Sequence, residues 1–253
     1  MLEIQGLTRQ FGGLLAVSGL DLVLKEGEIL SIIGPNGAGK TTIFNLIAGQ
    51  LRPTAGRIAF AGRDISGRSP HAVAKAGIAR TFQSTRLFGE LSVIKNLLIS
   101  CYCRTRVGLG GALLRSAGFK REEEESRQRA REILEFVGLD GQEQRRASEL
   151  PTEAQQRLAM ALALATKPRL LLLDEPTGGM NDEEVQRLIE LIRRIRETGV
   201  TVGLIEHRMK VVMGISDRVV VLNHGVKIAE GSPVEVQGNP EVIAAYLGTE
   251  GSD

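Results

Sequence analysis

The sequence is poor in cysteine: only Cys101 and Cys103 occur among its 253 residues, and they stand two positions apart. A single pair at that spacing provides neither a disulfide framework nor a metal site. No apolar run approaches the roughly 20 residues that a helix needs to span a bilayer. The start, Met1 to Ile4, lacks the basic region and the apolar stretch of an export signal. We therefore expect a cytosolic protein.

The sequence also lacks an excess of charge of either sign. Its 32 basic and 30 acidic residues give a formal net charge of +2, which gives no indication of nucleic acid as a partner. The apolar share of 42% and the charged share of 25% are those of an ordinary globular protein. The length suits one large α/β domain, or a core with an inserted subdomain.

What the sequence does contain is a phosphate-binding loop pattern: a glycine, four residues, then Gly-Lys-Thr. The run is Gly34-Pro35-Asn36-Gly37-Ala38-Gly39-Lys40-Thr41-Thr42. Ile29 to Ile33 before it predict a buried strand, and Thr42 to Ala48 predict a helix with an apolar face. A glycine-rich turn that binds nothing is the alternative, but these flanks are the context that nucleotide binding requires.

The chemistry of this loop suits a polyphosphate. Glycines let the backbone turn tightly, so that several N–H groups point at one anion, and the helix N-terminus adds the positive end of its dipole. Lys40 can reach the β- and γ-phosphates, and the Thr41 hydroxyl can ligate Mg²⁺. The loop therefore predicts a bound nucleotide with its metal ion.

Further candidate residues follow apolar strands. Leu170 to Leu173 lead into Asp174 and Glu175. In nucleotide hydrolases such an aspartate holds Mg²⁺, and the glutamate is placed to polarise an attacking water. His207 comes just after another apolar run that ends at Ile205. Each feature alone is ordinary, but open α/β sheets bind ligands beyond the carboxyl ends of their strands, so together they indicate one site.

The pattern of predicted elements divides the chain. Strands are predicted up to Gln83, helical periodicity replaces them from Leu91 to Ala165, and strands return from Leu170. A helix is predicted from Asp182 to Glu197, with Gly199 after its end. The pattern is that of an α/β core interrupted by a helical insertion.

The order of these motifs resembles that of the ATP-binding-cassette (ABC) ATPases. Over nearly the whole chain it is similar to the ATPase subunits of Liv-type branched-chain amino-acid importers. The runs that carry this narrower resemblance are Arg9 to Val17, Arg80 to Gln83, Arg86 to Phe88, Gly179 to Asn181 and Asn239 to Gly248. The resemblance implies one ABC ATP-binding domain: an α/β P-loop NTPase core at about 1–87 and 166–253, with an N-terminal antiparallel β subdomain and an inserted α-helical subdomain at about 88–165.

The resemblance also implies roles for single residues. Phe11 would stack on the adenine of ATP. Glu175 would be the catalytic base, His207 would hold the γ-phosphate, and Gln83 would contact the metal ion or the attacking water. The implied Mg²⁺ ligands are Thr41, Gln83 and Asp174.

The partners implied are those of an importer. The protein would dimerise face to face with a second ATP-binding subunit, identical or different, and drive two transmembrane permease subunits from the inner face of the cell membrane. A periplasmic binding protein would deliver the branched-chain (hydrophobic) amino acid. We expect the surface between Gln83 and Leu114, with the helical insertion, to dock a short permease helix, because the apolar Leu87 and Phe88 lie beside Gln83 in the sequence.

Two departures from the family pattern bear on activity. The helix that usually opens with a signature such as Leu-Pro-Tyr-Gly-Gln here opens with Leu150-Pro151-Thr152-Glu153-Ala154, and Leu162 stands where Arg is usual. Arg208 stands where Asp commonly follows the histidine. Because Glu153 would add a carboxylate near the γ-phosphate bound by the opposite subunit, we expect ATP hydrolysis by the isolated chain to be slow.

Three alternatives stay open. One is an importer of urea, another amide or another solute. Another is a hydrolysis-impaired subunit of a heterodimeric ATPase; the altered signature favours it, whereas the intact Lys40, Asp174, Glu175 and His207 disfavour it. The last is a soluble cassette that acts on ribosomes or DNA, but such proteins usually carry two cassettes or a long coiled coil, for which 253 residues leave no room.

Overall fold

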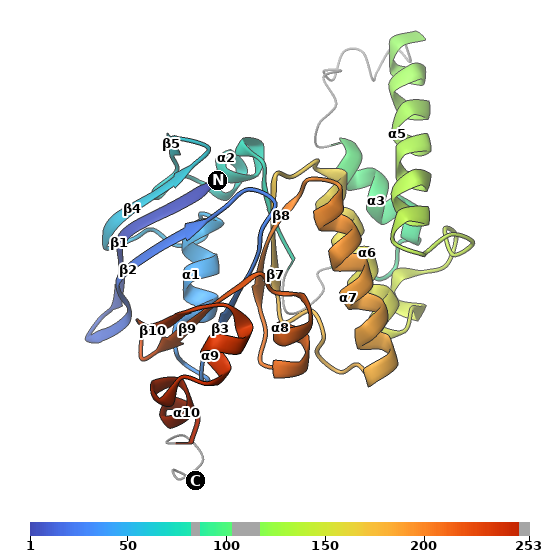
Figure 1. Ribbon diagram of the computed structural model, residues 1–253. Coiled ribbons are helices and arrows are strands. Elements are labelled where there is room, and N and C mark those ends of the chain that lie inside the picture. The colour runs from blue at the N-terminus through green and yellow to red at the C-terminus, as the bar shows by residue number, and fades with distance from the viewer. Residues whose placement is uncertain (82–86, 103–116, 248–253) are drawn as a thin grey trace.

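Figure 1 shows the computed structural model of the chain, which describes residues 1–81, 87–102 and 117–247. One of its two sheets is antiparallel, with the strand order β2-β1-β4-β5. Its strands are β1 (Leu2–Phe11), β2 (Leu14–Leu24), β4 (Ala55–Phe60) and β5 (Arg63–Asp64). Along β1, Leu2 and Ile4 are buried while Glu3 and Gln5 are exposed, so this sheet covers the core with one face only.

The other sheet has the strand order β10-β9-β3-β8-β7-β6, and every neighbouring pair in it except β9–β10 is parallel. Its strands are β3 (Ile29–Ile33), β6 (Ile78–Arg80), β7 (Leu170–Asp174), β8 (Thr201–Ile205), β9 (Arg218–Asn223) and β10 (Val226–Gly231). All residues of β3, β7 and β8 are buried, as expected for parallel strands that are covered on both faces.

One face of the parallel sheet packs against helix α1 (Lys40–Ile47), which lies between the two sheets (Figure 1). Ile43, Phe44, Leu46 and Ile47 of α1 are buried in the same hydrophobic cluster as residues of both sheets. The helix that begins at the phosphate loop is therefore held from two sides.

The opposite face packs against helices, and one continuous hydrophobic cluster extends from β7 and β8 through α7 and α6 to α3 and α5. The helices on this side are α3 (Val93–Tyr102), α5 (Ala117–Phe136), α6 (Thr152–Ala165), α7 (Asp182–Glu197) and α8 (Met209–Ile215), with a 3₁₀ turn η1 at Ala147–Glu149. The remaining helices are α2 (Pro70–Ala76), α9 (Pro233–Gln237) and α10 (Pro240–Leu247). Within the described ranges, no helix has the length and apolar character needed to cross a membrane.

The expected fold class is confirmed: an antiparallel sheet, an α/β core, and helices between β6 and β7. Helix α7 has the predicted bounds, because Asn181 and Glu184 form a reciprocal capping box at its start. The strand predicted up to Gln83 ends earlier, at Arg80, and Gln83 lies outside the described residues. The division of the domain near residues 88 and 165 stays a prediction.

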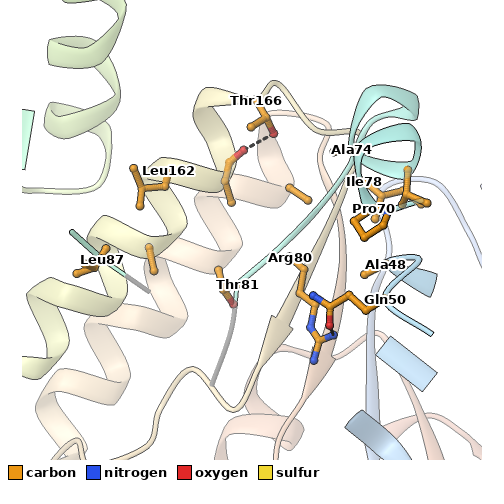
Figure 2. Close-up of a pocket in the computed structure, with 14 residues that line it drawn as sticks. Ala48, Gln50, Pro70, Ala74, Ile78, Arg80, Thr81, Leu87, Leu162 and Thr166 are labelled. Atoms are coloured by element: carbon orange, nitrogen blue, oxygen red, sulfur yellow. Dashed lines mark hydrogen bonds between the residues drawn. The ribbon is translucent and has the colours of Figure 1, made fainter. Parts of the chain in front are cut away.

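A groove of about 310 Å³ lies between the core and α6 (Figure 2). Pro70 and Ala74 of α2 line it together with Ile78 of β6, and Leu162 of α6 lines it from the other side with Leu87 nearby. Most of the lining is apolar, so the groove can accept an apolar side chain.

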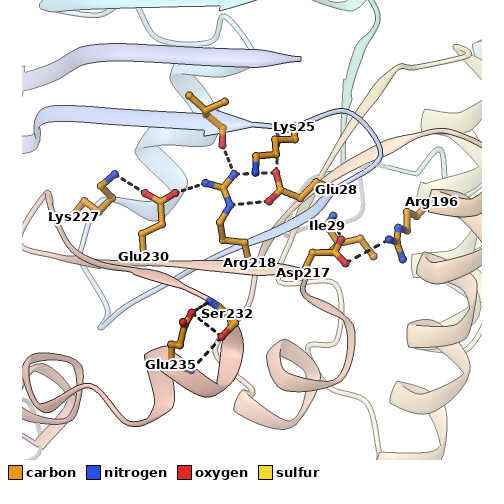
Figure 3. Close-up of polar contacts among 11 residues, drawn as sticks. Lys25, Glu28, Ile29, Arg196, Asp217, Arg218, Lys227, Glu230, Ser232 and Glu235 are labelled. Atoms are coloured by element: carbon orange, nitrogen blue, oxygen red, sulfur yellow. Dashed lines mark hydrogen bonds and ion pairs between the residues drawn. The ribbon is translucent and has the colours of Figure 1, made fainter.

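A buried ion pair joins the turn before β3 to the start of β9 (Figure 3). Arg218 donates to both carboxylate oxygens of Glu28, over 2.7 and 2.9 Å, and also contacts Glu230 and the carbonyl of Val23. Burial by itself raises the pKa of Glu28, but the hydrogen bonds and charges of Arg218 and Lys25 outweigh it and hold this pKa below its ordinary value. The pair therefore fixes the beginning of β3, which leads into the phosphate loop.

Replacing Glu28 by Gln is expected to lower the free energy of unfolding at neutral pH by about 1–3 kcal/mol, because Arg218 loses its paired carboxylate. Since the pKa of Glu28 is depressed by folding, the contribution is complete above the unfolded pKa and is lost as the pH falls through the lower, folded one. The free energies of unfolding of the unaltered protein and of Glu28→Gln, measured with denaturant, should therefore differ most near neutral pH and become equal in acid. The control is Glu26→Gln, which removes only an exposed ion pair with Arg169 and should change stability little. Equal effects of the two changes would contradict the assignment.

Candidate active site

The predicted phosphate loop connects β3 to α1, and two of its glycines are required by space as well as by backbone angle. Gly34 has φ 146°, and a Cβ atom there would stand 2.1 Å from the carbonyl oxygen of Leu222. Gly39 has φ 99°, and its Cβ would stand 2.4 Å from the carbonyl oxygen of Ala16. The loop is therefore wedged between β9 and β2, and no larger residue fits at either position.

Lys40, the first residue of α1, folds its side chain back over the loop. Its ammonium donates hydrogen bonds to the carbonyl oxygens of Gly34 and Pro35, over 2.7 and 2.8 Å. The side chain is buried, and burial lowers the pKa of Lys40, although the charges of Glu175 and Asp174 oppose this. The two carboxylates predicted at the end of β7 thus lie within electrostatic reach of the loop lysine.

Asp174 is buried at the end of β7 and forms an ion pair with Arg80 at the end of β6, 2.7 Å from Nη2 to Oδ2. Arg80 also donates to the side-chain oxygens of Asn45 and Gln50, so several neighbouring groups fix its guanidinium. The second oxygen of Asp174, Oδ1, is buried without a hydrogen-bond partner among the described residues. A buried carboxylate oxygen of this kind fits a hard divalent cation such as Mg²⁺.

Glu175 follows directly and turns the chain away from the sheet. Its φ is +48°, in the left-handed region that costs a non-glycine residue of order 1 kcal/mol. Its N–H donates to the carbonyl of Ile205 over 2.9 Å, which continues the β7–β8 pairing by one residue. This backbone conformation directs the Glu175 side chain to the border of the same cavity that the phosphate loop lines.

That cavity has a volume of about 420 Å³. It is lined by Phe11, Leu14, Leu15 and Ala16 from β1 and β2, by Asn36, Gly37, Ala38, Gly39, Lys40, Thr41 and Thr42 from the loop and α1, and by Glu175 and His224. The structure therefore brings together Phe11, predicted for adenine, most of the residues predicted for the phosphates, and Glu175, one of the three predicted catalytic residues, around one space. Phe11 is 40% exposed there, with the Arg9 guanidinium 4.4 Å from the centre of its ring.

His207 lies at the carboxyl end of β8, next to β7, but its side chain is 58% exposed and is not among the described residues that line the cavity. Glu206, the residue before it, is fully buried. Its carboxyl oxygens accept from the N–H groups of His207, Arg208 and Thr177 and from the Thr177 hydroxyl. Only the position of His207 was foreseen from the sequence; the network around Glu206 was not.

His224 is a lining residue that the sequence did not indicate. It stands in the turn between β9 and β10 with φ +47°. The next residue, Gly225, donates its N–H to Ala38 of the phosphate loop over 3.1 Å and accepts from Ser18 of β2 over 2.9 Å. The turn is therefore part of the cavity wall, and a short polar turn ending in glycine between two strands is the signal that could have pointed to it.

Helix α6 begins with the altered signature, in which Glu153 forms ion pairs with two arginines. Its carboxylate accepts from Arg157, four residues on, over 2.6 Å, and from Arg187 of α7 over 3.0 and 3.1 Å. Burial raises the pKa of Glu153, but these two guanidinium groups outweigh it and the pKa lies below its ordinary value. Two guanidinium groups thus pair with this one carboxylate, and Glu183 and Glu184 also interact with Arg187.

A phosphate loop, two strand-end carboxylates beside it and a helical segment between β6 and β7 are the features of a nucleotide-hydrolysing cassette. Residues 17–178 match the family described as ABC transporter, and residues 226–252 match the family described as branched-chain amino acid ATP-binding cassette transporter. The chain therefore belongs to the ATP-binding subunits of ABC transporters, and it is an ATPase subunit.

Within this family, the chain is 46% identical over 249 residues to the high-affinity branched-chain amino acid transport ATP-binding protein LivG of Salmonella typhimurium, with 98% of both chains covered. The fold is similar to that of the ADP conformation of an ATP-binding cassette of an ABC transporter, with a TM-score of 0.86, 32% identity and 98% of both chains covered. It is also similar to a dimeric cassette in a post-hydrolysis state bound to ADP and Pi, with a TM-score of 0.78, 26% identity and coverage of 92% of this chain and 99% of that one. The resemblance noted in the sequence is confirmed.

If Glu175 is the base, as the sequence predicts, replacing it by Gln is expected to leave MgATP binding nearly intact and to lower the rate of hydrolysis by about 100-fold or more. Lys40→Ala is the contrasting change, since it removes a phosphate contact and should weaken ATP binding instead. Nucleotide binding by titration calorimetry and phosphate release by the assembled complex separate the two effects. Wild-type hydrolysis by Glu175→Gln would show that this residue is not the base.

Proposed function

We propose that this chain is the ATP-hydrolysing subunit of an importer for branched-chain, hydrophobic amino acids. The observation that carries the proposal is the 46% identity over 98% of both chains to a subunit named for branched-chain amino acid transport. The family match at residues 226–252, which has the same substrate class in its description, supports it from another part of the chain.

We infer the following division of labour in hydrolysis. Phe11 stacks on adenine, the loop N–H groups and Lys40 bind the phosphates, and Glu175 accepts a proton from the attacking water. Asp174, through Oδ1, and the Thr41 hydroxyl would hold Mg²⁺, with Gln83 as a further ligand. The chemistry that such an ion would supply is neutralisation of the charge on the phosphates. His207 contacts the γ-phosphate from the end of β8.

The groove of Figure 2 is the proposed docking site for one permease subunit, and the second permease subunit would dock on the second cassette of the dimer. It opens between the core and α6, and its lining is mostly apolar. Leu87, one of the lining residues, follows Gln83 closely in the sequence. Leu162 occupies the position at which the family usually has Arg, which removes a charge from the groove. A short permease helix with an apolar side chain therefore suits this groove. Phe88 beside it is 58% exposed.

Replacing Leu162 by Glu is expected to reduce transport-coupled ATP hydrolysis by about tenfold, because a carboxylate in the apolar groove opposes docking of the permease helix. The measurement is phosphate release by the complex in proteoliposomes, stimulated by binding protein loaded with leucine, isoleucine or valine. Basal hydrolysis by the isolated chain should stay within about twofold, since the groove is separate from the nucleotide cavity.

The control for this change is Val234→Glu, which adds the same charge at a position on α9 that is 73% exposed. Equal loss in both variants would contradict the docking site. Stimulation by urea-loaded binding protein, and none by the branched-chain amino acids, would instead favour the alternative substrate.

Dimerisation with a second cassette is proposed because a similar solved cassette is a dimer bound to ADP and Pi. In such a dimer the start of α6 would face the nucleotide of the opposite subunit. The ion pairs of Glu153 with Arg157 and Arg187 offset its negative charge, so repulsion of the phosphates is smaller than the sequence suggested. The remaining effect of Glu153 is steric: with this side chain, the backbone N–H groups at the start of α6 cannot approach the phosphate as closely as glycine would allow. A homodimer would then have two slow sites, and a heterodimer one competent site.

Restoring the signature with Glu153→Gly and Ala154→Gln is expected to raise hydrolysis by the homodimer at least several-fold, roughly what a regained set of phosphate contacts provides. Glu153→Gln alone tests the charge; because the arginines already offset it, we expect a change within about twofold. Steady-state ATPase rates of the unaltered protein and the two variants are compared at saturating MgATP. An unchanged rate in the double variant would show that the signature is not limiting.

A further inference from the structure

The two residues on either side of His207 both bind the loop that joins β7 to α7. Glu206, before it, accepts at Oε1 from the N–H of Thr177 over 3.3 Å and from the Thr177 hydroxyl. Arg208, after it, donates from Nη1 to the carbonyl of Met180 over 3.1 Å and from Nη2 to Asp182 over 2.8 Å. The turn that carries His207 therefore contacts the loop near its beginning and again at its end.

The contact on the Glu206 side is entirely buried. Glu206 and Thr177 both have no exposed surface, and the other oxygen of Glu206 accepts from the N–H groups of His207 and Arg208 over 2.9 and 3.1 Å. One carboxyl group thus fixes the backbone of His207 and the loop after Glu175 to each other. A buried acceptor of this kind is costly to leave unsatisfied, so the two segments cannot separate easily.

The contact on the Arg208 side reaches the loop backbone. Met180 is buried, and its carbonyl is held by a guanidinium that is 28% exposed. The following residue, Asn181, is the N-cap of α7. Arg208 is also the residue at which this chain departs from the Asp that commonly follows the histidine, and an aspartate could not donate to a carbonyl.

We propose that Glu206 and Arg208 are positioning residues that hold His207 and the Thr177–Asp182 loop as one rigid unit during ATP hydrolysis. The proposal rests on the γ-phosphate contact proposed above for His207. Through this unit, a displacement of His207 toward the phosphate is transmitted to the loop that follows the catalytic Glu175, and to the start of α7. Arg208 acts only through His207 and the loop, and it touches neither nucleotide nor water.

Lys210 offers a matched control. It pairs with the same Asp182 carboxylate, over 2.9 Å, but within the described part of the chain it makes no hydrogen bond to the loop backbone, and it is 64% exposed. The hydrogen bond and charge of Lys210, with those of Arg208, hold the pKa of Asp182 below its ordinary value, so both cations interact with this group. Removing either takes one positive charge from the same surface, and only the Arg208 change releases Met180.

The test is ATP hydrolysis by the assembled complex with Arg208→Ala, Lys210→Ala and His207→Ala. Arg208→Ala should lower kcat by about five- to tenfold with KM for ATP within about twofold, and Lys210→Ala should leave both within about twofold. In the His207→Ala background, Arg208→Ala should change kcat less than about twofold, because its effect passes through the histidine. Arg208→Lys, which keeps one donor, should recover part of the rate.

The outcomes separate this proposal from the one it rests on. If His207→Ala alone leaves kcat unchanged, the γ-phosphate role of His207 fails, and the positioning role fails with it. If His207→Ala lowers kcat but Arg208→Ala behaves like Lys210→Ala, or its effect persists in the His207→Ala background, the positioning role alone is overturned. Glu206→Gln should reproduce the fall in kcat, since one oxygen that accepts becomes an amide that donates; wild-type kcat in that variant would also overturn the proposal.

Discussion

The parallel pairing of β3, β8 and β7 decides which side chains of this protein can meet one nucleotide. Ile205 is paired with Ile32 on one side and with Asp174 on the other, so the three strands end at the same level. The phosphate loop, the Asp174–Glu175 pair and the Glu206–Arg208 turn therefore all leave the sheet at one edge. A shift of one residue in either register would exchange side chains between the two packed faces of the sheet and take Asp174 out of line with Ile205.

Keeping polar groups at a buried edge has a cost in stability. Asp174, Lys40 and Glu206 are all buried, and each is satisfied mainly by groups of the site itself: Arg80, the loop carbonyls and the Thr177 segment. A buried ion pair is weak evidence for stabilisation, because desolvation offsets most of the attraction, whereas removal of one partner costs about 3–5 kcal/mol. The left-handed conformation of Glu175 adds to this cost. Burial of the hydrophobic core on both faces of the sheet provides the free energy of folding that offsets this cost.

The sequence could predict the parts of the site that depend on residues close together in the chain, but not those that depend on residues far apart. The phosphate loop and the Asp174–Glu175 pair follow from local patterns, and so does α7, whose capping box involves residues three apart. Glu206 could not be placed, because its partner Thr177 lies 29 residues earlier and no spacing rule relates them. The pair of Glu153 with Arg157 at four residues was readable as a helical ion pair. The pair with Arg187 depends on the packing of α6 against α7, which only the tertiary structure provides.

Both departures from the family pattern find their partners on α7, and this gives them a common physical meaning. Glu153 at the start of α6 binds Arg187, and Arg208 at the end of β8 binds Asp182 in the first turn of α7. Helix α7 is thus tied by charge both to the helix that bears the signature and to the turn that bears His207. Because α6 also packs against α7 through the shared hydrophobic cluster, a rotation of α6 must either carry α7 with it or break the Glu153 pairs. The two charged departures, Glu153 and Arg208, are therefore connected through a single helix.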